Sequence, residues 1–229
     1  MAVSVVIPVH NEEAILAGNV ARLELFLKKL RLPYELLIID NGSTDATPRI
    51  GRSLQSKTVR FFSIPKRGSV GDAFRLAVKE ARHEKIITQD MDLSVSMAFI
   101  PHCAKLLERS SMVIGSKMTG SQHRPLLRRA ASGTFIALVR VLLGLRYTDY
   151  SIGAKGYRKK DILTYLSRTE KGSAYVIELA YFLCSEGKGI AEIPVSCDDQ
   201  RRSRFNFIDE VAYRFRSLAA FWLRNKLLR

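Results

Sequence analysis

The sequence has little cysteine, and its three cysteines do not form a recognisable set. Cys103, Cys184 and Cys197 are odd in number and share no spacing typical of metal ligands. They therefore support neither a disulfide framework nor a zinc site. A reducing cytosol suits such a chain, and we expect a cytoplasmic protein.

Long apolar runs are also lacking. A helix that spans a bilayer needs about 18 or more apolar residues. The strongest candidate, residues 130–145, is shorter and contains Arg140. A strand pattern begins at residue 3, which leaves no room for the charged and apolar regions of a signal peptide. The sequence therefore predicts contact with a membrane surface at most.

Acidic residues are scarce beside basic ones. The 229 residues include 37 Lys and Arg against 22 Asp and Glu, a net charge of +15, of which residues 101–229 carry +12. That part therefore predicts a polyanionic partner: nucleic acid, a phosphorylated substrate or an anionic membrane. A nucleic-acid-binding module is the weaker alternative because the chain has no recognition motif and no aromatic platform, so we expect no nucleic-acid partner.

What the chain does contain is a regular alternation of strand and helix patterns. Apolar runs at residues 3–9, 35–40, 59–64 and 85–90 are each followed by a helical pattern, at about 12–30, from 47, 71–82 and 98–110. Near-continuous apolar strands separated by helices predict an α/β fold with a parallel sheet covered on both faces. Such sheets bind ligands beyond the carboxyl ends of their strands. We expect one elaborated domain.

A polar cluster follows each of the four strands, and the clusters are PVHNEE, DNGSTDAT, PKRGSVGDA and QDMDLS. All four would converge on one rim of the sheet. Asn41 and Gly42 are turn residues that tolerate positive φ, and Asp40 is placed to accept hydrogen bonds from a nucleotide base or ribose. Gly68 and Gly71 do not make the GxGxxG fingerprint, so a dinucleotide-dependent dehydrogenase is disfavoured.

The pair in QDMDLS is the strongest candidate for chemistry. Asp90 and Asp92 lie on the same side of a segment that is expected to be extended, so both carboxylates can face one point. Mg²⁺ or Mn²⁺ accepts such oxygen ligands and often shares them with a substrate phosphate. The pair therefore predicts a divalent metal site.

Together these motifs resemble the polyprenyl-phosphate (dolichyl-phosphate) mannose or glucose synthases of glycosyltransferase family 2. The resemblance extends through later landmarks in the family's order: GSK (115–117), RRAAS (128–132), TDYSIGAKGYR (148–158), EIPV (192–195) and RRSR (201–204). It implies a GT-A fold, a Rossmann-like and mostly parallel central sheet flanked by helices. It also implies a single catalytic domain, with residues 1–115 binding the nucleotide sugar, 116–205 the acceptor and 206–229 the membrane.

The resemblance implies roles for individual residues. Asp90 and Asp92 would bind the metal. The residues of the nucleotide pocket would be Pro8, Asn11, Glu12, Asp40, Asp45 and Gly68. The residues near the acceptor or the sugar would be Arg128, Asp149, Glu178, Arg201, Ser203 and Arg204, and those with catalytic roles would be Asp92, Arg128 and Arg204. Glu178 has an alternative reading as a salt-bridge partner.

The chain departs from the family pattern at four positions. Asn41 replaces the second Asp of a DDGS motif and His10 replaces a Tyr, which leaves the preferred base open. Met91 replaces a small residue but removes no metal ligand. Arg204 stands where Lys is frequent, and it keeps the charge while adding bidentate phosphate geometry.

The implied reaction is attack of a polyprenyl or dolichyl phosphate oxygen on the anomeric carbon of GDP-mannose or UDP-glucose, with inversion. A phosphate monoester is largely ionised near neutral pH, with a second pKa of about 6, so it needs little help from a general base. The sequence does not choose between the two donors. Alternatives within the fold are a family 2 enzyme with another acceptor, a nucleotidyltransferase and a pseudoenzyme.

The C-terminal segment predicts a basic amphipathic helix. Apolar residues recur at helical spacing in residues 207–229, namely Ile208, Val211, Phe215, Leu218 and Trp222, among several Arg and Lys. Residues 126–145 form a second apolar segment that is too short to span. We predict that both dock on the cytosolic membrane face. The alternative is that the C-terminal helix packs its apolar stripe on the sheet.

Overall fold

The structure is a computed structural model that describes residues 2–119, 126–197 and 207–227, with the side chains of 126–129, 207, 208 and 227 left out. Seven strands form one sheet: β1 (Val3–Val9), β2 (Tyr34–Asn41), β3 (Val59–Ile64), β4 (Lys85–Thr88), β5 (Met112–Ser116), β6 (Lys155–Arg158) and β7 (Ile190–Pro194). The helices are α1 (Leu16–Lys29), α2 (Thr47–Ser53), α3 (Val70–Glu80), α4 (Phe99–Leu106), α5 (Leu126–Leu143), α6 (Lys159–Ile162), α7 (Tyr175–Ser185) and α8 (Phe207–Leu227).

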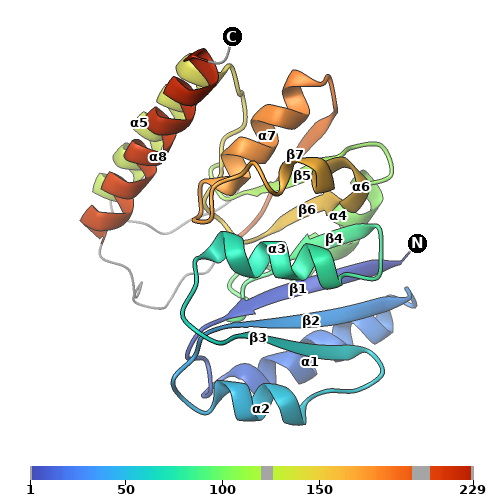
Figure 1. The fold of residues 1–229 in the computed structure, drawn as a ribbon. Helices are drawn as coiled ribbons and strands as arrows, with labels where there is room; N and C mark the ends of the chain where they lie inside the picture. Colours follow the sequence, from blue (N-terminus) through green and yellow to red (C-terminus); the bar gives the residue numbers. More distant parts are fainter. Residues whose placement is uncertain (1, 120–125, 198–206, 228–229) are drawn as a thin grey trace.

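The strands lie in the order β3-β2-β1-β4-β6-β5-β7 (Figure 1). β6 runs antiparallel to both of its neighbours, while the other pairs are parallel. Val9 pairs with Asp40, and Asn41 pairs with Ile64, so β1, β2 and β3 end together. The carboxyl ends of the parallel strands and the amino end of β6 therefore share one edge, called here the rim.

Two apolar layers cover the sheet because its inner strands alternate buried side chains between the two faces. α1 and α4 cover one face through residues such as Leu23 and Phe99, and α3 and α7 cover the other through residues such as Phe74 and Leu179 (Figure 1). This is the mostly parallel, doubly covered α/β architecture that the sequence predicts. The arrangement leaves the rim as the place where polar loops gather.

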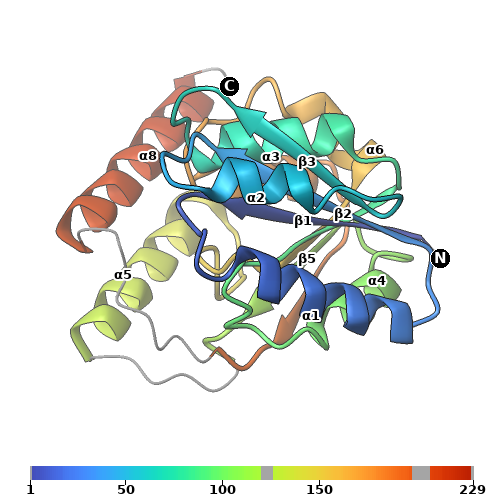
Figure 2. The ribbon, with the colours of Figure 1, turned by 90° about the horizontal axis from the view of Figure 1, so that it is seen from below.

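α5 and α8 lie side by side beyond the rim, as both views show (Figures 1 and 2). The rings of Phe135 on α5 and Phe215 on α8 meet in a T-shaped, edge-to-face arrangement with centroids 5.5 Å apart. Phe221 of α8 packs on Phe182 of α7 at 5.7 Å. α8 therefore buries Leu218 and Phe221. Leu218 belongs to the apolar stripe predicted from the sequence, whereas Phe221 is buried where Trp222 was predicted. Across the described residues, no helix combines the length and apolar character needed to cross a bilayer.

The expected elements match the observed ones closely at the strands and less closely at the helices. The strands predicted at 3–9 and 59–64 have those bounds. The helix predicted from residue 12 begins at Leu16, because residues 11–13 bond to the turn after β2 instead. The strand predicted at 85–90 ends at Thr88. Both differences arise where the chain reaches the rim.

Candidate functional site

The loop after β1 and the turn after β2 are joined by hydrogen bonds across the rim. Ser43 Oγ accepts from the backbone N–H of Asn11 at 2.8 Å, and Thr47 Oγ1 accepts from that of Glu12 at 2.8 Å. Asn11 adopts a positive φ of 54°, a conformation that asparagine tolerates better than most residues. Further bonds between the same segments run from Thr44 N to Asn11 Oδ1, from Glu13 N to Asp45 Oδ2 and from Ala46 N to Glu13 Oε2.

Asp40 and Asp45 organise this turn. Asp40 is buried and accepts from Ser63 Oγ at 2.6 Å and from the Ser43 N–H at 3.1 Å. Asp45 accepts from the Thr47 N–H at 2.9 Å at the start of α2. Burial raises the pKa of Asp45, but hydrogen bonds led by those from Thr47 outweigh burial and lower it. Both carboxylates thus have structural contacts within the predicted nucleotide pocket.

Pro8 and Gly68 complete the predicted nucleotide set. Pro8 lies in β1 and pairs in register with Ile39. Gly68 lies in the loop between β3 and α3, where its N–H and C=O both bond to the side chain of Asn41 at 3.0 Å. The structure therefore gathers the six predicted nucleotide residues along the ends of β1 and β2 and the loop after β3.

Asp90 and Asp92 lie in a turn rather than in the extended segment expected from the sequence. Met91 is buried in the core on the α1–α4 face, which draws the backbone inward between the two carboxylates. The Leu93 N–H donates to the Asp90 C=O at 3.1 Å, and Leu93 has a positive φ of 53°. Asp92 Oδ1 accepts from the Ser94 N–H at 3.0 Å. The turn still presents both carboxylates at the rim, next to the end of β4.

The two carboxylates repel each other. Loss of water around Asp90 raises the pKa of its carboxyl, and the negative charge of Asp92 raises it further. Asp90 Oδ2 accepts from the Gly153 N–H at 3.2 Å, which only partly offsets these effects. In the described part of the chain, neither carboxylate forms an ion pair, and no group of three or more His, Cys, Asp and Glu assembles as a metal-ligand set.

Behind Asp90 lies a buried set of charges: Lys117 directly follows β5, Asp149 lies in the loop before β6, and Lys155 is the first residue of β6. Lys117 Nζ donates to Ser151 Oγ at 2.8 Å and lies 3.6 Å from Asp149 Oδ2. Lys155 Nζ donates to the Ile152 C=O at 2.6 Å, and burial lowers the pKa of Lys155 to about 8. Burial raises the pKa of Asp149, but Lys155 and Lys117 outweigh burial and lower it. Asp149 thus lies beside two buried ammonium groups.

The sequence-based prediction covers one of these two lysines. The resemblance implies that the segment ending at Lys155, residues 148–155, lies close to the donor sugar or the acceptor, whereas Lys117 belongs to the landmark GSK and has no predicted role. Their burial depends on contacts between residues more than 30 positions apart, such as that between Lys117 and Asp149. The signal that could have found them is a lysine at the end of an apolar strand next to a carboxylate-bearing turn.

Glu178 lies in the first turn of α7 and is buried. It accepts from Arg224 Nη2 of α8 at 2.9 Å and from the Glu170 N–H at 2.5 Å. These contacts are those of a salt-bridge partner, the alternative that the sequence left open. Burial raises the pKa of Glu178 in spite of both bonds.

The remaining predicted acceptor residues are basic or polar residues of the second half. Arg128 belongs to α5, and its side chain lies outside the described residues. Arg201, Ser203 and Arg204 also lie outside the described residues. Their predicted contacts with phosphate therefore stay predictions.

A small pocket lies where α5, α7 and α8 meet the loop before β6. Its volume is about 250 Å³, including space open to solvent, and its lining includes Phe135, Tyr150, Ile177 and Arg214. The Tyr150 hydroxyl is buried and has no hydrogen-bond partner among the described residues. The pocket thus combines apolar walls with a cation and an unsatisfied hydroxyl, one residue from Asp149.

The sheet order, the rim and its turns define the class of protein: the fold is the GT-A fold of glycosyltransferases. Residues 4–166 match the family model described as glycosyl transferase family 2, and the chain belongs to that family. This confirms the family and the fold class predicted from the sequence.

Among curated proteins, the chain is similar to the undecaprenyl-phosphate 4-deoxy-4-formamido-L-arabinose transferase of Pseudomonas fluorescens. The two are 29% identical over 197 residues, which are 85% of this chain and 56% of the relative. The chain spans only 53 to 58% of the length of the curated relatives compared with it.

Among solved structures, the fold is similar to that of glucosyl-3-phosphoglycerate synthase from Mycobacterium tuberculosis. Its complex with phosphoglyceric acid has a TM-score of 0.71 and 20% identity, covering 97% of this chain and 79% of that one. The same enzyme with Mn²⁺, uridine diphosphate and glucosyl-3-phosphoglycerate has a TM-score of 0.68 and 21% identity, with the same shares covered. At this level of identity the likeness concerns the fold.

Proposed function

We propose that this protein is an inverting glycosyltransferase that moves a sugar from a nucleotide sugar to a polyprenyl phosphate. The observation that carries the proposal is the rim, where Asp90 and Asp92 lie beside the joined loops of β1 and β2 in a family 2 chain. Similarity to undecaprenyl-phosphate transferases supports the lipid-phosphate acceptor.

Asp90 and Asp92 would hold Mg²⁺ or Mn²⁺. The donor set fits a hard divalent cation, because two carboxylates that repel each other gain from a shared positive charge. When bound, such an ion supplies charge stabilisation for the departing diphosphate. The solved neighbour that contains Mn²⁺ and uridine diphosphate supports a metal of this kind.

Pro8, Asn11, Glu12, Asp40, Asp45 and Gly68 would form the nucleotide pocket. The bonds that Asp40 makes to Ser63 and Ser43 suggest that it orders the pocket wall as well as contacting the nucleotide. The backbone N–H groups of Asn11 and Glu12 are held at the rim by Ser43 and Thr47, so the backbone of this loop is set in place before any ligand arrives. Such preorganisation favours tight and specific donor binding.

The acceptor phosphate would meet the basic second half of the chain. Arg128, Arg201, Ser203 and Arg204 would bind it, and Asp149 would keep Lys117 and Lys155 in place beside the reacting groups. The contacts of Glu178 support a role in anchoring α8. The acceptor oxygen is already ionised near neutral pH, so the residues position two anions and need not remove a proton. The pocket lined by Phe135, Tyr150 and Arg214 suits the first apolar units of the lipid.

The finer proposal is a hexose donor, GDP-mannose or UDP-glucose, and a dolichyl or related lipid. The curated relatives are named for a different sugar, 4-deoxy-4-formamido-L-arabinose, and for undecaprenyl phosphate. A thermal-shift panel of nucleotide sugars, with and without Mn²⁺, should show one donor that stabilises the protein in a metal-dependent way. Transfer of labelled sugar from that donor to undecaprenyl or dolichyl phosphate would then test the acceptor. No metal-dependent shift with any nucleotide sugar would contradict the proposal.

We also propose that α5 and α8 attach the protein to the cytosolic membrane face. Their outer sides support this: Val141 is 79% exposed and Leu223 is 50% exposed, and Arg216 and Lys226 are exposed nearby on α8. Each basic residue near an anionic surface contributes about 1 kcal/mol, so attachment should be reversible and sensitive to salt.

Sedimentation with anionic liposomes tests this attachment. The protein should pellet at low salt and be partly released at high salt, and the pair Val141→Glu and Leu223→Glu should weaken pelleting without changing donor binding. If the unmodified protein stays in the supernatant at low salt, the docking proposal is wrong and α8 serves only to pack on α5 and α7.

A further inference from the structure

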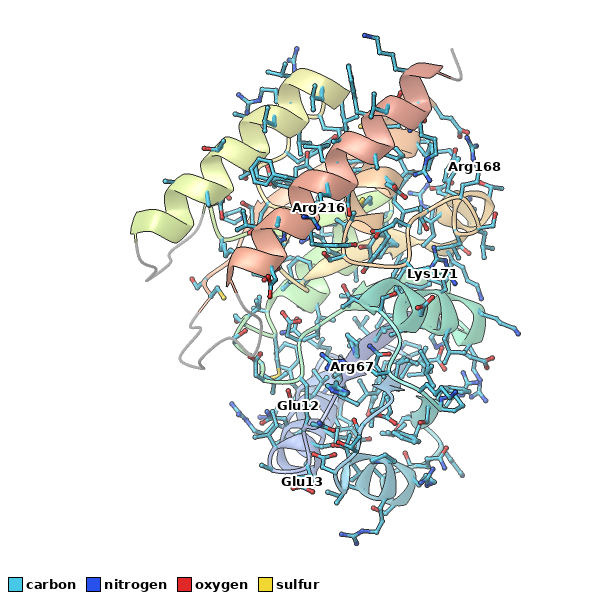
Figure 3. The ribbon with its side chains drawn as sticks, turned by 60° about the vertical axis from the view of Figure 1, so that its left-hand side comes forward. Glu12, Glu13, Arg67, Arg168, Lys171 and Arg216 are labelled. Carbon is cyan, nitrogen blue, oxygen red and sulfur yellow. The ribbon has the colours of Figure 1, made fainter. Side chains whose placement is uncertain are left out.

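The loop between β3 and α3 rests directly on the turn after β2. Gly42 has a φ of +68°, and a Cβ at this position would overlap the backbone of Lys66 and Arg67. Figure 3 shows Arg67 on this loop, between Glu12 of the β1 loop and Lys171 of the loop before α7. The loop therefore carries two exposed cations, Lys66 and Arg67, to the rim.

One side chain links this loop to β2 through a matched pair of hydrogen bonds. Asn41 Nδ2 donates to the Gly68 C=O at 3.0 Å, and Asn41 Oδ1 accepts from the Gly68 N–H at 3.0 Å. The two partners fix the orientation of the amide, because one needs a donor and the other an acceptor. The bonds resemble those between neighbouring strands, and we call them the amide clamp.

An amide can make this clamp, and an ionised carboxylate cannot. A carboxylate in the place of Asn41 would keep the bond from the Gly68 N–H but would direct a negative oxygen at the Gly68 C=O. A protonated carboxyl group, which has one O–H donor and one acceptor, could make both bonds again.

The far end of the loop is held separately. Ser69 and Asp72 form a capping box at the start of α3, with Ser69 N–H to Asp72 Oδ2 at 3.1 Å. Ser69 Oγ also donates to the Lys171 C=O. Because α3 fixes the loop at residue 69, loss of the clamp would release residues 65–68 without unfolding the helix.

We propose that Asn41 is a positioning residue that, through the amide clamp, holds Lys66 and Arg67 over the nucleotide pocket and so sets the affinity for the donor. The proposal rests on the proposed nucleotide-sugar donor. Two cations at the rim suit its diphosphate, and they gain affinity if they are ordered before binding. Asn41 itself need not touch the donor.

In the variant Asn41→Asp, formation of the amide clamp should depend on pH. At a pH of about 8 the new carboxylate is ionised, and donor affinity should fall about tenfold, the effect of a lost bond and a repelled carbonyl. At a pH of about 5 a growing fraction is protonated, and affinity should return toward the unmodified protein's value at the same pH. The titratable and charged groups around this position are His10, Asp40, Asp72, Lys66 and Arg67, with Lys171 beside Asp72.

Two measurements read out the clamp. Isothermal titration with UDP-glucose and GDP-mannose in the presence of Mn²⁺ gives donor affinity. Hydrogen exchange of the Gly68 amide reports whether the clamp is formed and needs no ligand. After correction for the intrinsic effect of pH on exchange, the Gly68 amide should exchange faster in Asn41→Asp than in the unmodified protein, and only at high pH. Asn41→Ser, which cannot span both partners, should weaken binding and protection at every pH.

The matched control is Gln55→Glu, the same amide-to-acid change at an exposed turn. Gln55 Oε1 only accepts, from the Phe61 N–H at 3.4 Å, so a carboxylate can replace it, and binding should stay unchanged at every pH. Wild-type affinity and slow Gly68 exchange in Asn41→Asp at high pH would overturn the proposal. Faster exchange with unchanged affinity would overturn it as well, because the loop would then not serve the donor. If neither nucleotide sugar binds the unmodified protein, the proposed hexose donors are wrong, while the exchange data still decide whether the clamp orders the loop.

Discussion

Glu35 and Asp90 are acidic side chains at opposite edges of the same sheet, and their surroundings differ. Glu35, at the amino end of β2, is 2% exposed. It accepts from Ser4 Oγ at 2.6 Å, from the Arg82 N–H at 2.5 Å and from Arg60 Nη1 at 2.9 Å. Burial raises the pKa of Glu35, but these hydrogen bonds outweigh burial and lower it. The protein itself supplies the hydrogen-bond donors and the positive charge that stabilise this carboxylate.

Asp90, just past the carboxyl end of β4, has the opposite balance. Its pKa is raised by loss of water and by the neighbouring Asp92, and the bond from the Gly153 N–H does not compensate. The edge at the amino ends of the parallel strands, called here the amino edge, therefore contributes stability because its buried carboxylate has hydrogen-bond partners within the protein. The rim instead keeps two carboxylates close together at a cost in stability, which is common where a site waits for a ligand.

The largest effect should come from removing one charge of the rim pair. Asp92→Asn should leave the fold intact but lower metal-dependent turnover about a thousandfold, because several kcal/mol of charge stabilisation are lost. A steady-state assay of sugar transfer over a range of Mn²⁺ concentrations checks this. Turnover within about threefold of the unmodified enzyme would show that Asp92 does not hold the metal.

At the amino edge the same type of change should act on stability alone. Glu35→Gln leaves one oxygen for three donors and turns an amide toward Arg60, so the free energy of unfolding should fall by about 2 to 4 kcal/mol. Urea denaturation measures this, and donor affinity should not change. The control is Glu108→Gln, whose side chain is 56% exposed in its pair with Lys85 and whose effect should stay below about 1 kcal/mol.

The pH dependence follows from the direction of the Glu35 shift. A carboxyl with a lowered pKa in the folded state stabilises the protein above its unfolded-state pKa of about 4.3, and this stabilisation is lost as the pH falls through the lower folded-state value. The stability difference between the unmodified protein and Glu35→Gln should therefore be constant near neutrality and shrink in acid. A difference that grows in acid would contradict the assigned contacts.

Much of the fold was predictable because it depends on local patterns. Apolar residues in runs of strand length gave β1 and β3 with their bounds. β1 is largely buried on both faces and therefore needs a nearly unbroken apolar run, while β3 lies at the edge of the sheet and is buried less completely. The helical period gave α8, but its buried face includes Phe221 where Trp222 was predicted. A helix alone does not reveal which neighbours it will meet, and α5 and α7 select that face.

The sequence predicted which residues lie at the rim, but it predicted their geometry less well. The strand-end clusters placed Asp40, Asp90 and Asp92 near one another, because parallel strands end at one edge. The turn at Asp90 was not predictable, since it depends on the burial of Met91 in the core on the α1–α4 face. Nor were the contacts of Lys117 with Asp149, because they join residues 32 positions apart.

A smaller effect should follow from crowding the rim without changing any charge. A Cβ at Gly153 would overlap the Asp90 carboxylate, so Gly153→Ala must displace Asp90 or the loop before β6. Turnover should fall about thirtyfold, consistent with a displacement of about 1 Å at the reacting groups. The control is Gly18→Ala on α1, where a Cβ meets nothing within 4 Å and turnover should not change. Equal turnover in both variants would show that the position of Asp90 does not matter.

The smallest effect is also the most direct test of the contrast between the two edges. Asp90→Asn removes a charge that the fold disfavours, so without metal the free energy of unfolding should rise by about 1 kcal/mol, opposite in sign to Glu35→Gln. The raised pKa means that unmodified Asp90 costs most stability when the pH is above its folded-state value. The cost declines as the pH falls through that value and is gone below the unfolded-state pKa of about 3.9. The gain in Asp90→Asn should therefore be present at neutral pH and vanish in acid, as urea denaturation at several pH values can measure. Added Mn²⁺ should reverse the order, because the ion stabilises only the protein that binds it. A loss of stability in Asp90→Asn without metal would mean that the rim, like the amino edge, is held together by its carboxylates.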